Sequence, residues 1–281
     1  MPAAKAGPPA VAPLRVGMAG FGSVGAFVAR RLDEGAIPGV TLTALTARDL
    51  DKAARNAAGL KSKPRVVPLV ELAELADVVI ECATADAFPA IARAVLGAGR
   101  TMIALSAAGV PAVPDLLEFA LAHRGRLRIA SGALPGIDSL RCAAEGTIRS
   151  VRLRSRIVPA TFIGEPYLSE RGFDFTKPTT EAIRVFAGSA REAAAAFPRH
   201  FNVAISLSLA GIGFDRTEVE IHADPGVPGA VHQVEVDAEE AQFTLISRNR
   251  PSVANPKTSR IIAPSVLAAL RTLVAPIHVG S

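Results

Sequence analysis

The sequence has no tryptophan, one tyrosine and only two cysteines among its 281 residues. The two cysteines, Cys82 and Cys142, exclude a disulfide-based scaffold and a Cys/His array with zinc spacing. No apolar run reaches the ~18 residues that a membrane-spanning helix needs, so no membrane partner is expected. Residues 1–13 lack the charged start and apolar run of a signal peptide and are expected to form a flexible tail. A cytoplasmic location is the resulting expectation.

The excess of one sign of charge over the other is also small. The chain has 31 Lys and Arg against 26 Asp and Glu, a net charge of +5, within an ordinary globular composition of 49% hydrophobic residues. Nucleic acid is not expected as a partner, because this excess is small and few aromatic side chains are present to stack on bases. A small anionic substrate or a phosphate-bearing cofactor fits the same charge balance. The length suits two domains.

Residues 14–135 alternate short apolar runs with Ala-rich stretches of helical character. Asp77–Cys82 reads DVVIEC, a run of the kind found in strands that are covered on both faces. Repeated βα units of this kind predict a parallel, doubly wound sheet of the Rossmann type, and so an α/β fold. The expected strands are 14–19, 40–46, 65–67, 77–82, 101–105 and 127–130, and the expected helices are 23–33, 49–58, 70–76, 87–96 and 114–122.

Residues 136–254 follow a different pattern. In 151–158 apolar residues and Ser155 alternate with arginines, and the segments 217–223, 231–236 and 242–247 also alternate like antiparallel strands. A capping box at Ser189 precedes an Ala-rich helix. These features predict a second, α+β domain with a mixed or antiparallel sheet and helices on one side. Residues 255–281 form a C-terminal segment, whose helix at 265–274 is expected to pack back on the first domain.

A glycine pattern lies between the first predicted strand and helix. Gly20 would allow the tight turn, Gly22 the approach of a pyrophosphate to the backbone, and Gly25 close helix–strand packing. The helix start, with Ser23 and Val24, would supply free N–H groups and a positive dipole to the phosphates. The alternative is an ordinary tight turn, but the strand before and the helix after it favour a dinucleotide site.

The end of the second predicted strand bears on the choice of nucleotide. An NAD site usually has an acidic residue there, about twenty residues after the glycines, to hold the ribose hydroxyls. This chain instead reads Thr46-Ala47-Arg48-Asp49. An arginine next to a small residue suits a 2′-phosphate, so NADP is expected to be accepted as well as NAD. The alternatives are that Asp49 reaches back to the ribose or that Arg48 is merely solvated.

Several short segments follow one another in a distinctive order after residue 130. They are SGALPGID (131–138), FAGSAR (186–191), FP (197–198) with NVA (202–204), AGIG (210–213), ADP (223–225), His232 and NPKTS (255–259). In this order the segments resemble the L-aspartate dehydrogenase family, and the resemblance covers the chain from residue 14 onward. It implies a homodimer that binds NAD(P) and interconverts L-aspartate, a dicarboxylic amino acid, with iminosuccinate, which can feed NAD biosynthesis.

The resemblance also implies site residues. It assigns the catalytic role to His232, which follows the ADP segment, and nicotinamide-side contacts to Ala133 and Asn202. Two departures bear on substrate preference. The chain reads Ala230-Val-His232 where the family often has Asn-x-His, and His200 stands where the family tends to have a second asparagine.

Strand alternation separates the two closest histidine candidates without the family. His222 shares a face with Glu218 and Glu220 and is expected to be solvated, whereas His232 shares a face with Val234 and should point inward. A buried imidazole that stays neutral near pH 7 can accept a proton, so His232 is the expected general acid/base. A histidine merely packed in the core is the alternative.

The groups that hold the substrate carboxylates are less defined. Candidates are the arginine row Arg152, Arg154 and Arg156, and Lys257, because guanidinium and ammonium groups bind carboxylates. An alternating arginine row is more often the solvated face of a sheet. Ser106 and Thr84 follow predicted strands at the edge where such sheets bind ligands, with ordinary turns as the alternative.

The sequence therefore predicts an NAD(P)-dependent amino-acid dehydrogenase that acts on aspartate. Two alternatives remain open: a related NAD(P)H-dependent reductase of another amino or imino acid, and a non-catalytic dinucleotide-binding sensor. Turnover separates the sensor from the enzymes, since a sensor binds the cofactor without changing it.

Overall fold

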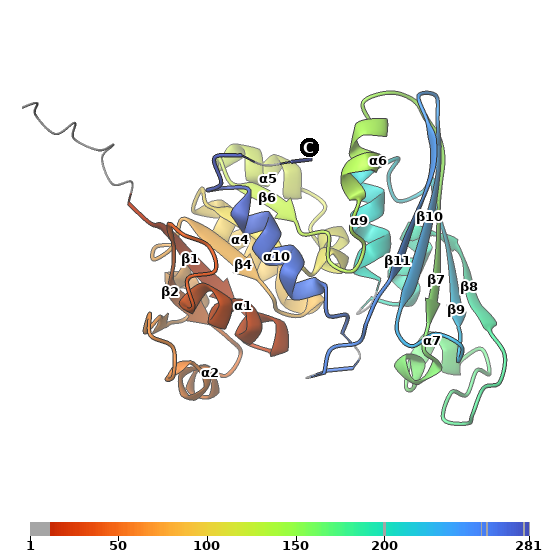
Figure 1. The fold of residues 1–281 in the computed structure, drawn as a ribbon, viewed down its shortest axis with the longest axis horizontal. Coiled ribbons are helices and arrows are strands. Elements are labelled where there is room, and N and C mark those ends of the chain that lie inside the picture. Colours follow the sequence, from red (N-terminus) through yellow and green to blue (C-terminus); the bar gives the residue numbers. More distant parts are fainter. Residues whose placement is uncertain (1–11, 199–200, 254, 257, 278, 281) are drawn as a thin grey trace, which may run out of the picture.

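The computed structural model describes residues 12–198, 201–253, 255–256, 258–277 and 279–280, which form two lobes side by side (Figure 1). The first lobe is built on a six-stranded, wholly parallel sheet, sheet A, with strand order β3-β2-β1-β4-β5-β6. This order is that of a doubly wound Rossmann sheet and confirms the predicted fold class. Its strands are β1 (Leu14–Ala19), β2 (Val40–Thr46), β3 (Arg65–Val66), β4 (Val78–Glu81), β5 (Thr101–Ala104) and β6 (Arg126–Ile129).

Helices cover both faces of sheet A, which is why residues Val78–Ile80 of its central strand β4 are apolar on both faces. In β4, Val78 and Ile80 pack in the core on the α1 side, whereas Val79 packs in the core that contains α4. The helical elements of this lobe are α1 (Ser23–Asp33), α2 (Leu50–Ala57), α3 (Leu69–Leu72), α4 (Phe88–Gly97), α5 (Leu116–Ala122) and the 3₁₀ turns η1 (Ala85–Ala87) and η2 (Ala107–Ala112).

The second lobe contains a five-stranded mixed sheet, sheet B, with order β11-β10-β7-β9-β8. The β7–β9 pair is parallel and the other pairs are antiparallel, as the prediction of a mixed sheet required. Helices α6 and α9 lie on the face of sheet B that is turned toward the first lobe (Figure 1). The elements are α6 (Ile137–Ala143), β7 (Ile148–Ile157), η3 (Pro159–Phe162), α7 (Pro166–Ser169), β8 (Ile183–Ser189), α8 (Ala190–Ala196), α9 (Asn202–Ala210), β9 (Thr217–Ala223), β10 (Val231–Ala238) and β11 (Gln242–Arg248).

Four of these elements were not predicted from the sequence: the short η3 and α7, strand β8 and helix α6. Strand β8 has a bulge between Arg184 and Phe186, so the consecutive residues Val185 and Phe186 are both buried and the alternation that marks a strand is broken. Helix α6 has seven residues and begins after Gly136, whose backbone is left-handed. The predicted capping box at Ser189 is present, with the Glu192 carboxylate accepting from the Ser189 backbone N–H.

The last helix, α10 (Ile262–Arg271), packs on the first lobe. Val266 and Leu270 are fully buried in the same core as Val28 and Leu32 of α1. The helix begins and ends three residues earlier than the predicted 265–274, and Ser265 lies within its first turn, where its hydroxyl donates to the Ile262 carbonyl. Helix α10 therefore returns the chain from sheet B to the nucleotide-binding fold.

Candidate active site

The predicted glycine turn lies between β1 and α1 and is closely packed at both ends. Gly20 has a left-handed backbone (φ +101°), and a Cβ there would lie 2.6 Å from the carbonyl carbon of Cys82. A Cβ on Gly25 would lie 2.4 Å from the Gly20 carbonyl oxygen. Backbone atoms cannot withdraw from such contacts as a side chain can, so both positions require glycine.

Gly22, by contrast, faces open space. No atom lies within 4 Å of a Cβ built there, and Gly22 serves as the N-cap of α1 without a side-chain hydrogen bond. Ser23 is exposed and Val24 half-buried, and the first turn of α1 contains no acidic residue. The N–H groups and positive dipole of this helix start are thus available to a phosphate, which is the arrangement that a dinucleotide needs.

Arg48 and Asp49 follow β2 at the same edge of sheet A. Arg48 is exposed. Asp49 is the N-cap of α2, and its Oδ1 accepts a hydrogen bond of 2.8 Å from the Lys52 N–H. The Asp49 carboxylate is thus already used as the N-cap of α2, whereas Arg48 is exposed beside it.

The carboxyl ends of β4 and β5 meet at a buried acid that the sequence prediction missed. Glu81, the last residue of β4, is 0% exposed and was read as part of an apolar run. Its carboxylate accepts from the Ser106 hydroxyl and from the backbone N–H groups of Ala83, Leu105 and Ser106. Burial raises the pKa of Glu81, and these hydrogen bonds act against that effect. The sequence signal was a single acid at the carboxyl end of an otherwise apolar strand.

Ser106 and Thr84 were both predicted to lie at this edge, but Ser106 is buried and hydrogen-bonded whereas Thr84 is exposed. The Ser106 hydroxyl lies 2.9 Å from Glu81 Oε1 and 2.9 Å from the Ala83 carbonyl oxygen, so it organises the loop ends. Thr84 is exposed just before η1 and makes no side-chain cap.

Asn202 connects the two lobes. It is the first residue of α9, and its Oδ1 accepts a hydrogen bond of 2.9 Å from the Ala108 N–H in η2, just beyond the end of β5. The bond fixes the orientation of the side-chain amide, leaving its NH₂ group as the donor end. Asn202 thus lies beside the loop that follows β5, at the carboxyl edge of sheet A, where open sheets of this kind bind ligands.

Ala133 lies in a second connection between the lobes. It follows β6, and its carbonyl oxygen accepts from the Ser247 hydroxyl and the Asn249 side-chain amide, each at 3.0 Å. The preceding Gly132 donates its N–H to Ser265 Oγ at the start of α10. Loops after β5 and β6 are therefore both bonded to the second lobe.

His232 lies on the inner face of sheet B next to this connection. It is 4% exposed and pairs in register with Ser247 on β11 and Ser155 on β7. Its Nδ1 lies 2.9 Å from Ser155 Oγ. Burial lowers the pKa of His232 from its usual 6.5 to about 4, so the imidazole is neutral at physiological pH. Because Ser247 also bonds Ala133, the strand pairing places His232 beside the Ala133 segment.

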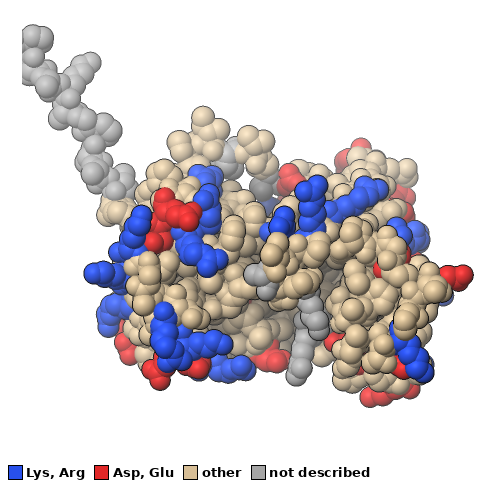
Figure 2. Space-filling view, turned by 60° about the horizontal axis from the view of Figure 1, so that its bottom comes forward, with Lys and Arg blue, Asp and Glu red and all other residues tan. Residues whose placement is uncertain are grey.

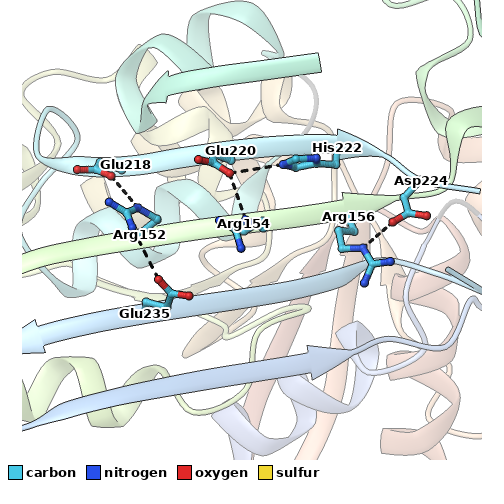
Figure 3. Close-up of polar contacts among 8 residues, drawn as sticks. All are labelled: Arg152, Arg154, Arg156, Glu218, Glu220, His222, Asp224 and Glu235. Atoms are coloured by element: carbon cyan, nitrogen blue, oxygen red, sulfur yellow. Dashed lines mark hydrogen bonds and ion pairs between the residues drawn. The ribbon is translucent and has the colours of Figure 1, made fainter. Parts of the chain in front are cut away.

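The arginine row lies on the opposite face of sheet B (Figure 3). Arg152 pairs with Glu218 at 2.9 Å, Arg154 with Glu220 at 3.1 Å, and Arg156 with Asp224. His222 is on this face too, half-buried with Nε2 3.5 Å from Glu220 and so less exposed than predicted. These arginines therefore do not hold a substrate next to His232. The remaining clamp candidate, Lys257, lies outside the described residues, as does His200.

Charge elsewhere is mixed. On the face drawn in Figure 2, basic and acidic side chains are interspersed over both lobes. Within the described ranges, no three His, Cys, Asp or Glu side chains gather in a way that could hold a metal ion. Nor does the described part of the chain contain a helix with the length and apolarity to cross a bilayer.

Comparisons with known proteins agree with this architecture. Residues 138–273 match the model for the C-terminal region of aspartate dehydrogenase, and residues 20–130 match the NAD-binding domain of homoserine dehydrogenase. The crystal structure of aspartate dehydrogenase from Thermotoga maritima is similar in fold, with a TM-score of 0.69 at 22% identity, covering 95% of this chain and 99% of that chain.

Sequence relatives are closer. L-aspartate dehydrogenase 3 of Bordetella bronchiseptica is 43% identical over 268 residues, which are 95% of this chain and 98% of the relative. L-aspartate dehydrogenase of Bradyrhizobium diazoefficiens is 41% identical over 95% of this chain and 94% of its own length. At this identity and coverage, the chain belongs to the L-aspartate dehydrogenase family.

Proposed function

We propose that this protein is an NAD(P)-dependent L-aspartate dehydrogenase that converts L-aspartate reversibly to iminosuccinate, which water hydrolyses to oxaloacetate and ammonia. The observation that carries the proposal is the buried, neutral His232, bonded to Ser155 and next to the Ala133 segment at the carboxyl edge of a nucleotide-binding sheet. Family membership supplies the substrate class, and the site supplies a base of the required kind.

The glycine turn and helix α1 fit the pyrophosphate of the cofactor, since Gly22 leaves its backbone open and α1 presents free N–H groups. When bound, NAD(P) accepts the hydride from the substrate Cα, or returns it in the reverse direction. The exposed Arg48 supports the use of NADP besides NAD. Asn202 and Ala133 are proposed to hold the nicotinamide side, Asn202 through its side-chain NH₂.

His232 is proposed to move the proton. With Nδ1–H donating to Ser155 Oγ, Nε2 keeps its lone pair and takes a proton from the substrate amine as the C–H bond breaks and the C=N bond forms. After this proton has left the imidazolium, the regenerated neutral Nε2 takes a proton from the water that adds to the imine carbon. In the reverse direction the imidazolium returns these protons. Burial keeps bulk water from competing for Nε2.

The direct test is a steady-state assay of the purified protein with L-aspartate and either NAD⁺ or NADP⁺ at alkaline pH, and in reverse with oxaloacetate, ammonia and NAD(P)H. A panel with glutamate, alanine and homoserine defines the substrate. Turnover of aspartate above the other amino acids supports the proposal. Turnover of another substrate only would indicate the related reductase, and cofactor binding without turnover on any substrate would indicate a sensor.

The protein is further proposed to act in the cytoplasm as a homodimer. The face of sheet B that carries the arginine row is turned away from α6 and α9, so it is available to a second copy of the chain (Figures 1 and 3). Light scattering coupled to size-exclusion chromatography would distinguish a dimer from a monomer of 29.1 kDa.

A further inference from the structure

Glu81 occupies a position where a carboxylate is costly. It is fully buried at the end of β4, the strand in the middle of sheet A, and pairs in register with Ala19 of β1 and Ala104 of β5. Central strands of a parallel sheet are covered on both faces, and an apolar residue would satisfy packing there. A buried charge is retained without loss of stability only when several donors bond it.

Four donors converge on this carboxylate. Oε1 accepts from the Ala83 N–H at 2.7 Å and from the Ser106 hydroxyl at 2.9 Å. Oε2 accepts from the N–H groups of Ser106 at 2.9 Å and Leu105 at 3.1 Å. The bonds therefore tie together two loops, one after β4 and one after β5, through a single side chain.

The first loop is the surface on which the glycine turn packs. A Cβ on Gly20 would lie 2.6 Å from Cys82 backbone atoms and 2.7 Å from the Ala83 nitrogen, which is the nitrogen that donates to Glu81. The Ala83 carbonyl oxygen lies 2.9 Å from the same Ser106 hydroxyl oxygen, whose single O–H is shared between this carbonyl and Glu81 Oε1. Glu81 thus sets the position of the backbone beneath the pyrophosphate turn.

The second loop leads to the other lobe. Leu105 and Ser106 are bonded to Glu81, and two residues later the Ala108 N–H donates to Asn202 Oδ1 at the start of α9. The short segment 105–108 is therefore held at one end by the buried carboxylate and at the other by the second lobe. A shift at Glu81 reaches the pyrophosphate turn and Asn202 together.

We propose that Glu81 is a positioning residue for the cofactor, acting through Ala83 on the pyrophosphate turn and through the segment 105–108 on Asn202. The inference rests on the proposed function only in taking NAD(P) as the ligand. In this proposal the buried Glu81 aligns the pyrophosphate turn with Asn202, and so the two halves of the dinucleotide site.

The test replaces the carboxylate by its isostere in Glu81→Gln. Glutamine keeps the volume but presents an NH₂ group to backbone N–H donors, so at least one of the two loops must move away. NADPH binding is measured by the fluorescence of the reduced cofactor without substrate, which the absence of tryptophan in this chain makes free of tryptophan background. The expected result is about a tenfold or larger increase in the NADPH Kd, with the chain still folded.

A matched control separates positioning from stability. Thr43 makes part-buried contacts in sheet A, with Oγ1 2.7 Å from the Leu75 carbonyl oxygen and 3.2 Å from that of Val16, but it bonds neither loop. Thr43→Val should lower the melting temperature and leave the NADPH Kd unchanged. Ser106→Ala removes only the hydroxyl donor, and should weaken NADPH binding by a smaller factor even if Glu81→Gln does not fold.

The outcomes are distinct. If Glu81→Gln and Ser106→Ala lower the melting temperature but bind NADPH as the wild type does, Glu81 is structural only and the inference is overturned. If Thr43→Val weakens NADPH binding as strongly as they do, general loosening of the sheet explains the effect and the inference is again overturned. Failure of the wild type to oxidise aspartate while it binds NADPH would overturn the proposed function and leave this inference standing.

Discussion

His232 Nδ1 lies 2.9 Å from Ser155 Oγ. The two residues pair in register on the adjacent strands β10 and β7. Both residues are buried, at 4% and 0% exposure. The pairing holds the imidazole by its Nδ1 edge. In the mechanism proposed above, Nδ1–H donates to Ser155 Oγ and Nε2 is the basic atom.

We expect His232→Ala to lower kcat for aspartate oxidation by about 10²–10⁴-fold, because the proton acceptor is lost, while NADPH binding persists. Steady-state kinetics and cofactor fluorescence measure the two effects. Turnover at the wild-type rate would reject the role of His232.

Ser155→Ala is the companion variant, since it leaves the imidazole in place but removes its orienting partner. A smaller loss of kcat, about tenfold, is expected with little change in the NADPH Kd. A loss in Ser155→Ala as large as in His232→Ala would show that the serine does more than orient the ring.

The lowered pKa of His232 predicts a dependence of stability on pH. The folded chain disfavours the charged imidazole. The contribution of His232 to the free energy of unfolding is therefore present above pH 6.5 and is lost as the pH falls from 6.5 to about 4. At about 1.4 kcal/mol per pKa unit, the loss amounts to about 3 kcal/mol of unfolding free energy.

Denaturant unfolding of the wild type and of His232→Gln at several pH values between 4 and 7 tests this. The stability of the wild type relative to the variant should fall across the interval, because glutamine does not titrate. A difference that stays constant with pH would mean that the pKa of His232 is the same in the folded and in the unfolded chain.

Much of the first lobe was predictable because local patterns and tertiary contacts agree there. The segments 23–33 and 40–46 were predicted with the bounds that α1 and β2 have, since each lies between a clear turn signal and an apolar run. In sheet B the alternation of 217–223 gave β9 for the same reason. The inward direction of His232 also followed from alternation, which burial confirms.

Other features depend on contacts that a linear pattern does not contain. Alternation showed that Arg152 and Arg154 share a face, but the choice of face depends on where α6 and α9 pack. The ties from Asn202 to Ala108 and from Asn249 to Ala133 join residues that are 94 and 116 positions apart. The role of Glu81 likewise depends on donors from two loops that meet only in the folded sheet.

Arg48→Ala should weaken binding of NADPH much more than that of NADH. The guanidinium is proposed to pair with the 2′-phosphate, a charge-assisted contact that NADH lacks, and its loss is expected to cost about tenfold or more in Kd. Titration of both reduced cofactors by fluorescence gives the ratio. Arg55→Ala, on the exposed side of α2, is the control, because it removes the same charge away from the strand end. Equal weakening of NADH and NADPH by Arg48→Ala would exclude a contact with the 2′-phosphate.

Alanine substitutions at Gly25 and Gly22 are expected to have opposite effects on stability and on cofactor binding. A Cβ on Gly25 would lie 2.4 Å from the Gly20 carbonyl oxygen, so Gly25→Ala should destabilise the fold itself. Gly22→Ala meets no atom within 4 Å, and its backbone (φ −78°, ψ −162°) suits alanine, so the melting temperature should change little.

NADPH binding by Gly22→Ala should nevertheless weaken about tenfold or more, because the added methyl group occupies the space that the pyrophosphate needs. Thermal unfolding and cofactor fluorescence on the same samples separate the two effects. Unchanged affinity in a normally folded Gly22→Ala would mean that the pyrophosphate does not approach the backbone at this position, and would move the cofactor away from the start of α1.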